Sequence, residues 1–120
     1  GIVPHVNVLG LAACEAAYRD CADWHDELIT YLRGNRDQAF VTVNAEKGVK
    51  MSRVEATYLA WIDVRELGLE KPAAYFEAHG LGLSDGADFG APGWLRLNFG
   101  CTRKTLDQAL SRFATACRSA

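Results

Sequence analysis

Apolar residues recur at helical spacing near the end of the chain. They fall at i, i+3, i+4, i+7, i+8 and i+11, at Leu106, Ala109, Leu110, Phe113, Ala114 and Cys117. This spacing places them on one face of an α-helix. Thr102 is a suitable N-cap, and Thr105 with Gln108 also fits a capping box. The pattern predicts a helix that begins near Thr102 and packs against a core.

Two further helices are predicted in the N-terminal part of the chain. The alanine-rich stretch from Asn7 to about Ala22 permits a helix, with Asn7 as its N-cap. A second helix should begin at Ala22 or Asp23, and the turn-forming residues 44–48 should end it. Six of its residues recur on one helical face, namely Trp24, Leu28, Tyr31, Leu32, Asn35 and Ala39.

Alternating positions predict strands in the middle of the chain. Residues 49–54 form a short candidate strand and residues 57–64 a better one. Successive side chains of a strand point to opposite faces, so Tyr58 and Trp61 lie on different faces of the second strand. At most one of them can therefore face a cleft, and core packing is the expected role for each.

Proline and glycine punctuate the segment that follows. Pro72 suits a first helical turn and Gly80 the position after the last, which predicts a short helix over residues 72–79. Residues 80–93 contain five glycines and one proline, which predicts a loop that bends sharply and lets backbone approach a ligand. No G-K-[ST] follows, so the loop is not a phosphate-binding loop of that type.

The run Trp94-Leu95-Arg96-Leu97-Asn98-Phe99-Gly100-Cys101 predicts a strand that ends in a glycine turn. Alternation places the leucines and the phenylalanine on one face and Trp94, Arg96 and Asn98 on the other. A guanidinium and an amide beside an indole could bind a small carboxylate. A half-buried strand whose polar face meets solvent fits the same spacing, and spacing alone favours this simpler interpretation.

Together these elements describe an α/β (α+β) fold. The order helix, helix, strand, strand, helix, strand, helix predicts a two-layer sandwich, in which a small, mainly antiparallel sheet has helices packed on one face. The 120 residues contain no repeat or linker, so we expect residues 1–120 to form a single domain.

Composition and charge narrow the classes of function. The hydrophobic fraction of 49% and the charged fraction of 23% are typical of a globular protein. A net charge of −2 with scattered basic residues gives no electrostatic basis for binding nucleic acid or an anionic membrane. No apolar run approaches the length of a membrane span, and the start lacks a signal-peptide pattern.

The cysteines and histidines predict no metal site. Cys14, Cys21, Cys101 and Cys117 form no C-x-x-C pair, and the three histidines are dispersed. Cys14 and Cys117 lie in helical patterns, where a free cysteine fills apolar space. Reduced thiols predict a cytoplasmic protein. Because Gly1 replaces an initiating methionine, we expect the chain to be a piece of a longer protein.

Four segments resemble the C-terminal small domain of pyridoxal-phosphate enzymes of the class I/II aminotransferase superfamily (fold type I). Within it, the MalY/PatB-type cystathionine β-lyase (C–S lyase) branch is the most similar. The segments follow the family's order and spacing, and they are residues 31–37 (YLRGNRD), 55–63 (EATYLAWID), 82–90 (GLSDGADFG) and 95–101 (LRLNFGC). Val54, Asp85 and Thr102 replace prolines that are usual in the family, which changes two turns and one helix start.

The resemblance implies that Arg96 binds the α-carboxylate of an L-amino-acid substrate. A planar guanidinium can hold a carboxylate through two parallel hydrogen bonds, which agrees with this role. Asn98 could brace Arg96 or be an ordinary strand amide. Tyr58, Phe89 and Gly90 are candidate cleft or loop residues, and the loop that carries the last two could close over substrate or only turn the chain.

The resemblance also implies what this chain lacks. The lysine that binds pyridoxal 5'-phosphate covalently, and the groups that hold its phosphate, belong to the family's large domain. We therefore expect no catalytic residue here, an inactive fragment, and a homodimeric parent enzyme. That parent is expected to be a C–S lyase that releases thiol, pyruvate and ammonia, with an aminotransferase or a free-standing, non-catalytic α/β binding domain as the alternatives.

Overall fold

The computed structural model describes residues 5–120, so the expectation about Gly1 lies outside the described residues. The chain falls into two compact units, Gly1–Tyr31 and Leu32–Ala120. The first unit contains α1 (Val8–Asp20) and the start of α2 (Ala22–Asn44). The Asn7 side chain caps α1 by accepting a hydrogen bond from the Gly10 N–H at 2.8 Å. Both N-terminal helices are therefore confirmed.

Helix α1 has no buried residue in the described structure. Its exposed side chains include Val8, Leu9 and Leu11, and Cys14 is exposed as well. The prediction that Cys14 fills apolar space inside the fold is therefore wrong for this chain. An alanine-rich stretch without a clear apolar face indicates a helix but does not indicate which side of the helix is buried.

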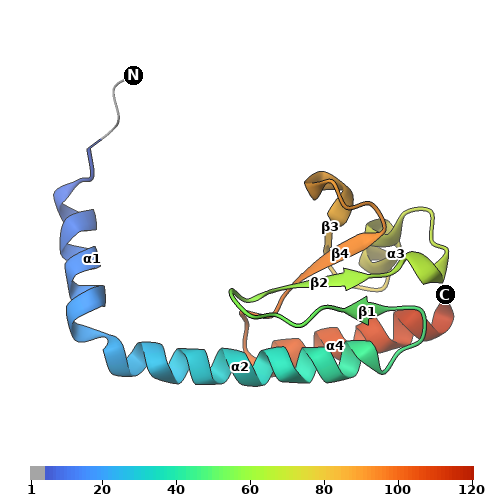
Figure 1. Ribbon diagram of the computed structural model, residues 1–120, viewed down its shortest axis with the longest axis horizontal. Coiled ribbons are helices and arrows are strands. Elements are labelled where there is room, and N and C mark those ends of the chain that lie inside the picture. Colours follow the sequence, from blue (N-terminus) through green and yellow to red (C-terminus); the bar gives the residue numbers. More distant parts are fainter. Residues whose placement is uncertain (1–4) are drawn as a thin grey trace. The chain divides into compact units, whose positions relative to one another are not determined.

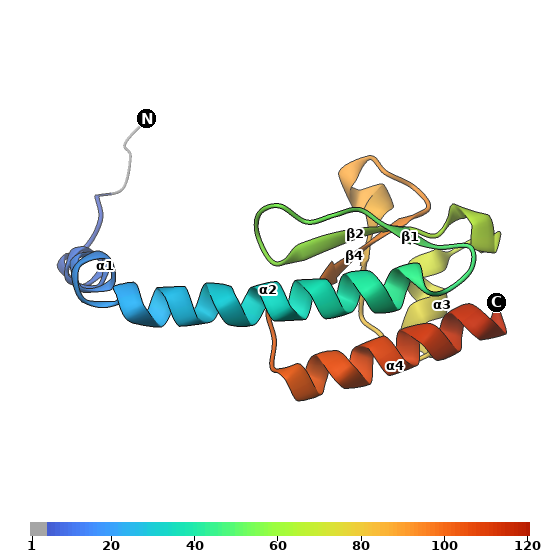
Figure 2. The same cartoon turned by 60° about the horizontal axis from the view of Figure 1, so that its bottom comes forward.

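The second unit is built on an antiparallel sheet in the order β1-β2-β4-β3 (Figure 1). Its strands are β1 (Lys50–Met51), β2 (Leu59–Asp63), β3 (Ser84–Asp85) and β4 (Trp94–Asn98). The part of α2 from residue 32 onward and α4 (Arg103–Ser119) run side by side on one face of the sheet (Figure 2). Helix α3 (Pro72–Ala78) adds Phe76 to the same core. The predicted two-layer α/β sandwich is confirmed.

The core lies between the helices and one face of the sheet. Strand residues Ala60, Ile62, Leu95 and Leu97 are buried there, as alternation predicts. The predicted face of α4 is buried or half-buried, and Phe113 stacks on Phe76 with 5.0 Å between ring centroids. The Thr102 hydroxyl accepts a hydrogen bond from the Thr105 N–H at 3.3 Å, which confirms the predicted cap. Cys117 is buried in this core.

Two strand predictions are corrected by the structure. Only Lys50–Met51 of residues 49–54 forms a strand, because the chain then turns toward Thr57, which has a left-handed φ of 66°. Residues 80–93 are more than a loop, since Ser84–Asp85 pairs with β4 and Gly86–Phe89 forms a 3₁₀ turn, η2. A two-residue strand among glycines has no periodicity that a sequence pattern could reveal.

A buried asparagine joins the helix layer to the end of β4. The Asn35 side chain on α2 is fully buried. Its Nδ2 donates to the Phe99 and Cys101 carbonyl oxygens, each at 2.9 Å. Its Oδ1 has no hydrogen-bond partner among the described residues. These hydrogen bonds satisfy two carbonyls in a turn that leaves the sheet, and they connect residues far apart in sequence.

We expect Asn35→Ala to lower the free energy of unfolding by about 2–4 kcal/mol, because it leaves one buried and one part-buried carbonyl unpaired. Asn35→Asp should cost more, since it replaces the donor with a buried acceptor or charge. Urea unfolding measures both. Val41→Ala on the exposed side of α2 is the control and should change stability by less than about 0.5 kcal/mol. Equal stability of Asn35→Ala and this control would contradict the assignment.

Candidate carboxylate-binding site

The outer face of the sheet carries the polar residues of the two longest strands. Antiparallel register sets Trp61 of β2 directly opposite Arg96 of β4. Both side chains are partly buried, and both lie on the face away from the helices and the core. The prediction that Trp61 packs in the core is therefore wrong. Its indole instead borders an arginine in the middle of a paired strand.

The Arg96 guanidinium has a defined set of neighbours. Strand β3 pairs with β4 so that Ser84 lies opposite Arg96, and Nη2 of Arg96 donates to the Ser84 hydroxyl at 3.3 Å. The Phe89 ring covers the guanidinium, with 4.3 Å from Cζ to the ring centroid. The ion pairs among residues 5–120 all involve other residues. Arg96 therefore keeps donor capacity for a carboxylate.

Local backbone features fix Phe89 in place. The Asp85 side chain caps η2 by accepting from the Ala87 N–H at 2.9 Å, and Gly90 ends the turn with a left-handed φ of 77°. Gly86 is buried, and a Cβ there would lie under 3.0 Å from the carbonyl oxygens of Ala91 and Trp94. Only glycine fits such a position without displacing backbone. The glycines of this segment therefore shape a compact turn.

The structure brings together some of the predicted site residues. Phe89 contacts both Arg96 and Trp61, the latter edge-on at 5.6 Å between centroids. Asn98 is exposed, and its Oδ1 accepts from the Gly100 N–H at 2.8 Å. Bracing of Arg96 by Asn98 stays a prediction. The side chain that accepts a hydrogen bond from the Arg96 guanidinium is Ser84. Ser84 could not be identified from the sequence, because Ser84 lies in the two-residue strand β3, which the sequence pattern does not reveal.

Tyr58 borders the turn after β4. Its side chain is 48% exposed, so the prediction of core packing is wrong. A Cβ at Gly100 would lie 3.0 Å from Cδ2 of Tyr58, so the glycine allows the ring to approach the turn. Tyr58 lies just before β2, next to Thr57, whose left-handed φ turns the chain at this point. A cleft role for Tyr58 stays a prediction.

A hollow lies beside Trp61 of β2. Its walls are residues 52–57, and Leu59 and Trp61 also line it. Trp61 is the cross-strand neighbour of Arg96, but Arg96 itself is not among the residues that line this hollow. The arginine site thus combines one cation with an aromatic cover, which suits a small organic anion.

The described residues contain neither a cluster of potential metal ligands nor a buried lysine. No group of three potential metal-ligating side chains occurs among residues 5–120. Lys47, Lys50, Lys71 and Lys104 are all exposed, so none is held in a cleft where it could bind a carbonyl cofactor. Burial raises the pKa of the Cys117 thiol to about 11, so at neutral pH this cysteine is a protonated core residue.

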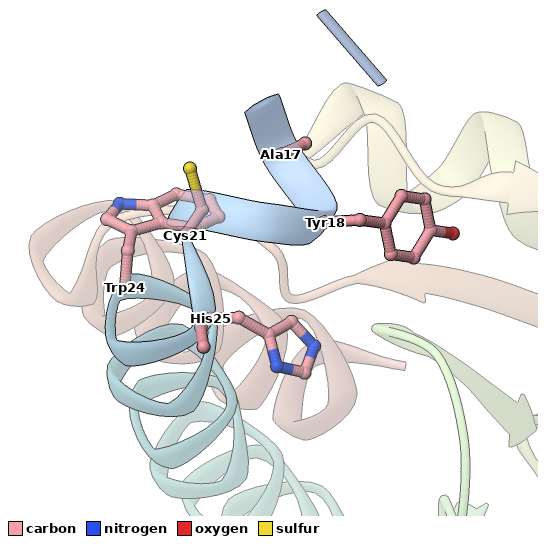
Figure 3. A pocket seen from close by; sticks show the side chains of 6 residues that line it. Ala17, Tyr18, Cys21, Trp24 and His25 are labelled. Atoms are coloured by element: carbon pink, nitrogen blue, oxygen red, sulfur yellow. The ribbon is translucent and has the colours of Figure 1, made fainter. Parts of the chain in front are cut away.

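The first unit has a separate hollow at the bend between α1 and α2. Figure 3 shows its lining side chains, with Cys21 near Trp24 and with Tyr18 and His25 on the other side. Tyr18 is 88% exposed and Trp24 63% exposed. This surface is apolar and carries no cluster of catalytic groups. None of the helices within residues 5–120 combines the length and apolarity that a membrane-crossing helix requires.

Comparison with known proteins identifies the family. Residues 5–113 match the family Aminotransferase class I and II. The chain is 40% identical over 114 residues to cystathionine beta-lyase of Corynebacterium glutamicum, covering 92% of this chain and 30% of that protein. It is 35% identical over 117 residues to cystathionine beta-lyase PatB of Bacillus subtilis, with coverage of 92% and 30%.

Solved structures give the same result. The crystal structure of OvoB matches with a TM-score of 0.95 and 46% identity, covering 100% of this chain and 32% of that one. A putative PLP-dependent beta-cystathionase from Corynebacterium diphtheriae matches with a TM-score of 0.87 and 36% identity, covering 96% and 32%. The chain belongs to the class I and II aminotransferase family. It spans about 30% of the length of the curated relatives it matches.

We expect Gly86→Ala to disrupt the η2 turn, because its Cβ would collide with two backbone carbonyls. Displacement of Phe89 from Trp61 should change the near-ultraviolet circular dichroism, and stability should fall by about 1–3 kcal/mol. Gly82→Ala is the matched control, since a Cβ at Gly82 would meet no atom within 4 Å. If the two variants behaved alike, the packing assigned to Gly86 would be wrong.

Proposed function

We propose that this chain is the C-terminal small domain of a larger pyridoxal-phosphate enzyme, and that Arg96 binds the α-carboxylate of its L-amino-acid substrate. The observation that carries the proposal is the position of Arg96 on a central strand. It has a hydroxyl partner, an aromatic cover and no carboxylate partner among residues 5–120. A guanidinium can bind the carboxylate through two parallel hydrogen bonds, which sets its orientation as well as its position.

Orientation of the carboxylate matters for the reaction class. Pyridoxal phosphate supplies an electron sink for the bonds around the substrate Cα. The anchor that this chain offers restricts rotation about that carbon, which helps to decide which bond aligns for cleavage. This chain would therefore bind and orient, while the covalent chemistry requires the rest of the protein.

Within the family we propose a C–S lyase that releases thiol, pyruvate and ammonia from an L-amino acid. Support comes from the relatives named cystathionine beta-lyase, at 40% and 35% identity. Structures with cofactor also favour it, such as the PLP-bound C-S lyase from Staphylococcus hominis at 25% identity. An aminotransferase would use the same Arg96 contact, so the two reactions are separated by assay.

The rest of the parent protein is proposed to cover helix α1. Its apolar side chains are exposed, including Leu9 at 78% and Leu11 at 58%, and such exposure is typical of an interface. We further propose a homodimeric, cytoplasmic parent. The four cysteines are free thiols, which agrees with a reducing compartment. A free-standing binding domain would leave α1 without a partner.

We expect Arg96→Lys in the full-length enzyme to lower kcat/KM for the amino-acid substrate about 10- to 100-fold, because lysine cannot form the two parallel hydrogen bonds. Steady-state kinetics measure this effect. Arg112→Lys is the control, since Arg112 donates to the Gly80 carbonyl on the surface and lysine retains a donor. Unchanged kinetics of Arg96→Lys would reject the carboxylate-binding role.

The lyase assignment predicts release of pyruvate and a thiol when the full-length enzyme is incubated with cystathionine. Coupled assay with lactate dehydrogenase measures pyruvate, and a thiol reagent measures the other product. This chain alone, incubated with pyridoxal phosphate, should give neither product and no visible cofactor absorption band. Keto-acid-dependent transfer of the amino group without thiol release would instead identify an aminotransferase.

A further inference from the structure

We propose that Phe89 is a positioning residue for Arg96, holding the guanidinium so that a substrate carboxylate binds in its plane and along its open edge. This inference rests on the proposed carboxylate-binding function of Arg96. It assigns a role to an aromatic side chain that is 50% exposed and that burial alone would not fix in one orientation.

The contacts of the guanidinium leave one region for a ligand. Phe89 covers one face at 4.3 Å from Cζ, a distance at which the electron-rich face of the ring attracts the cation. The Ser84 hydroxyl accepts from Nη2. Nη1 has no hydrogen-bond partner among residues 5–120. A planar carboxylate that approaches in the plane of the guanidinium can reach its remaining N–H groups, whereas the covered face is closed to it.

Phe89 is itself held from a second side. The Trp61 ring meets it edge-on at an interplanar angle of 86°, an arrangement that aromatic pairs prefer. Trp61 is in turn set opposite Arg96 by the β2–β4 register. Phe89 therefore contacts two cross-strand neighbours, and each of these contacts restrains its ring. Loss of the Phe89 ring would free the guanidinium to rotate about its side-chain torsions.

The backbone of η2 supports the same assignment. The Asp85 cap, the crowded Gly86 and the left-handed Gly90 fix the turn that ends in Phe89. An exposed aromatic at the end of so constrained a turn has a defined direction, and that direction is toward Arg96. Pre-organisation of this kind lowers the entropy that ligand binding would otherwise have to overcome.

The test is a double-mutant cycle in the full-length enzyme with its amino-acid substrate. We expect Phe89→Ala and Phe89→Leu to lower kcat/KM about 3- to 30-fold, and Phe89→Tyr, which keeps the ring, to stay within about 2-fold of wild type. In an Arg96→Lys background the Phe89→Ala change should have little further effect, because the group that it positions is gone. Asp88→Asn on the same turn is the control for disturbance of η2.

The outcomes distinguish the two proposals. Wild-type kinetics of Phe89→Ala and Phe89→Leu, with Arg96→Lys impaired, would overturn the role of Phe89 and leave that of Arg96 intact. An equal fold-loss from Phe89→Ala in both backgrounds would also overturn it, since a general structural role is additive. Unchanged kinetics of Arg96→Lys would overturn both proposals. Thermal unfolding midpoints of all variants verify that the compared enzymes are folded.

Discussion

The amide of Asn35 is the interaction on which the arrangement of the second unit depends. Its two hydrogen bonds to the Phe99 and Cys101 carbonyls attach the helix layer to the turn where the chain leaves β4. The preceding residue, Gly34, has no side chain, which leaves room for the Arg103 guanidinium at the start of α4. Two adjacent residues of α2 therefore lie against the β4–α4 connection. Asn35 donates to the residues that follow β4, and Gly34 lies against the Arg103 side chain at the start of α4. The strand that bears Arg96 is fastened at the point where it would otherwise fray.

The two faces of one sheet meet opposite requirements. Leu95 and Leu97 of β4 are buried against the helices, and Arg96 between them faces the other way. Because the side-chain period of a strand is two residues, burial of the leucines determines the face on which the guanidinium lies. A shift of one residue in register would put a charge into the apolar core. Core packing and the position of the proposed carboxylate-binding arginine are thus specified by the same alternation, which places Arg96 on a rigid element.

The strongly periodic elements could be predicted from the sequence and the irregular ones could not. The face of α4 and the alternation of β4 followed from apolar residues at regular spacing. Ser84 escaped notice because β3 has two residues and is created by pairing with β4, a contact distant in sequence. Asn35 was placed on one helical face with apolar residues, but its burial and its hydrogen bonds to a distant turn had no local signal. Arg96 could be identified as a candidate from the sequence, whereas the Phe89 ring that covers it could be recognised only from the structure.

A second arginine, in the turn that follows β2, shows the contacts of an arginine with an ion pair inside this fold. Arg65 lies over Trp94, with 5.7 Å from Cζ to the ring centroid, and also pairs with the Asp63 carboxylate at 2.7 Å. The hydrogen bond from Arg65 holds the pKa of Asp63 below its usual value. Arg96 has the aromatic contact but a neutral hydroxyl where Arg65 has a carboxylate. Since a guanidinium remains charged at any physiological pH, this difference between the two arginines supports the proposal that a carboxylate from outside the described residues is the counter-ion of Arg96.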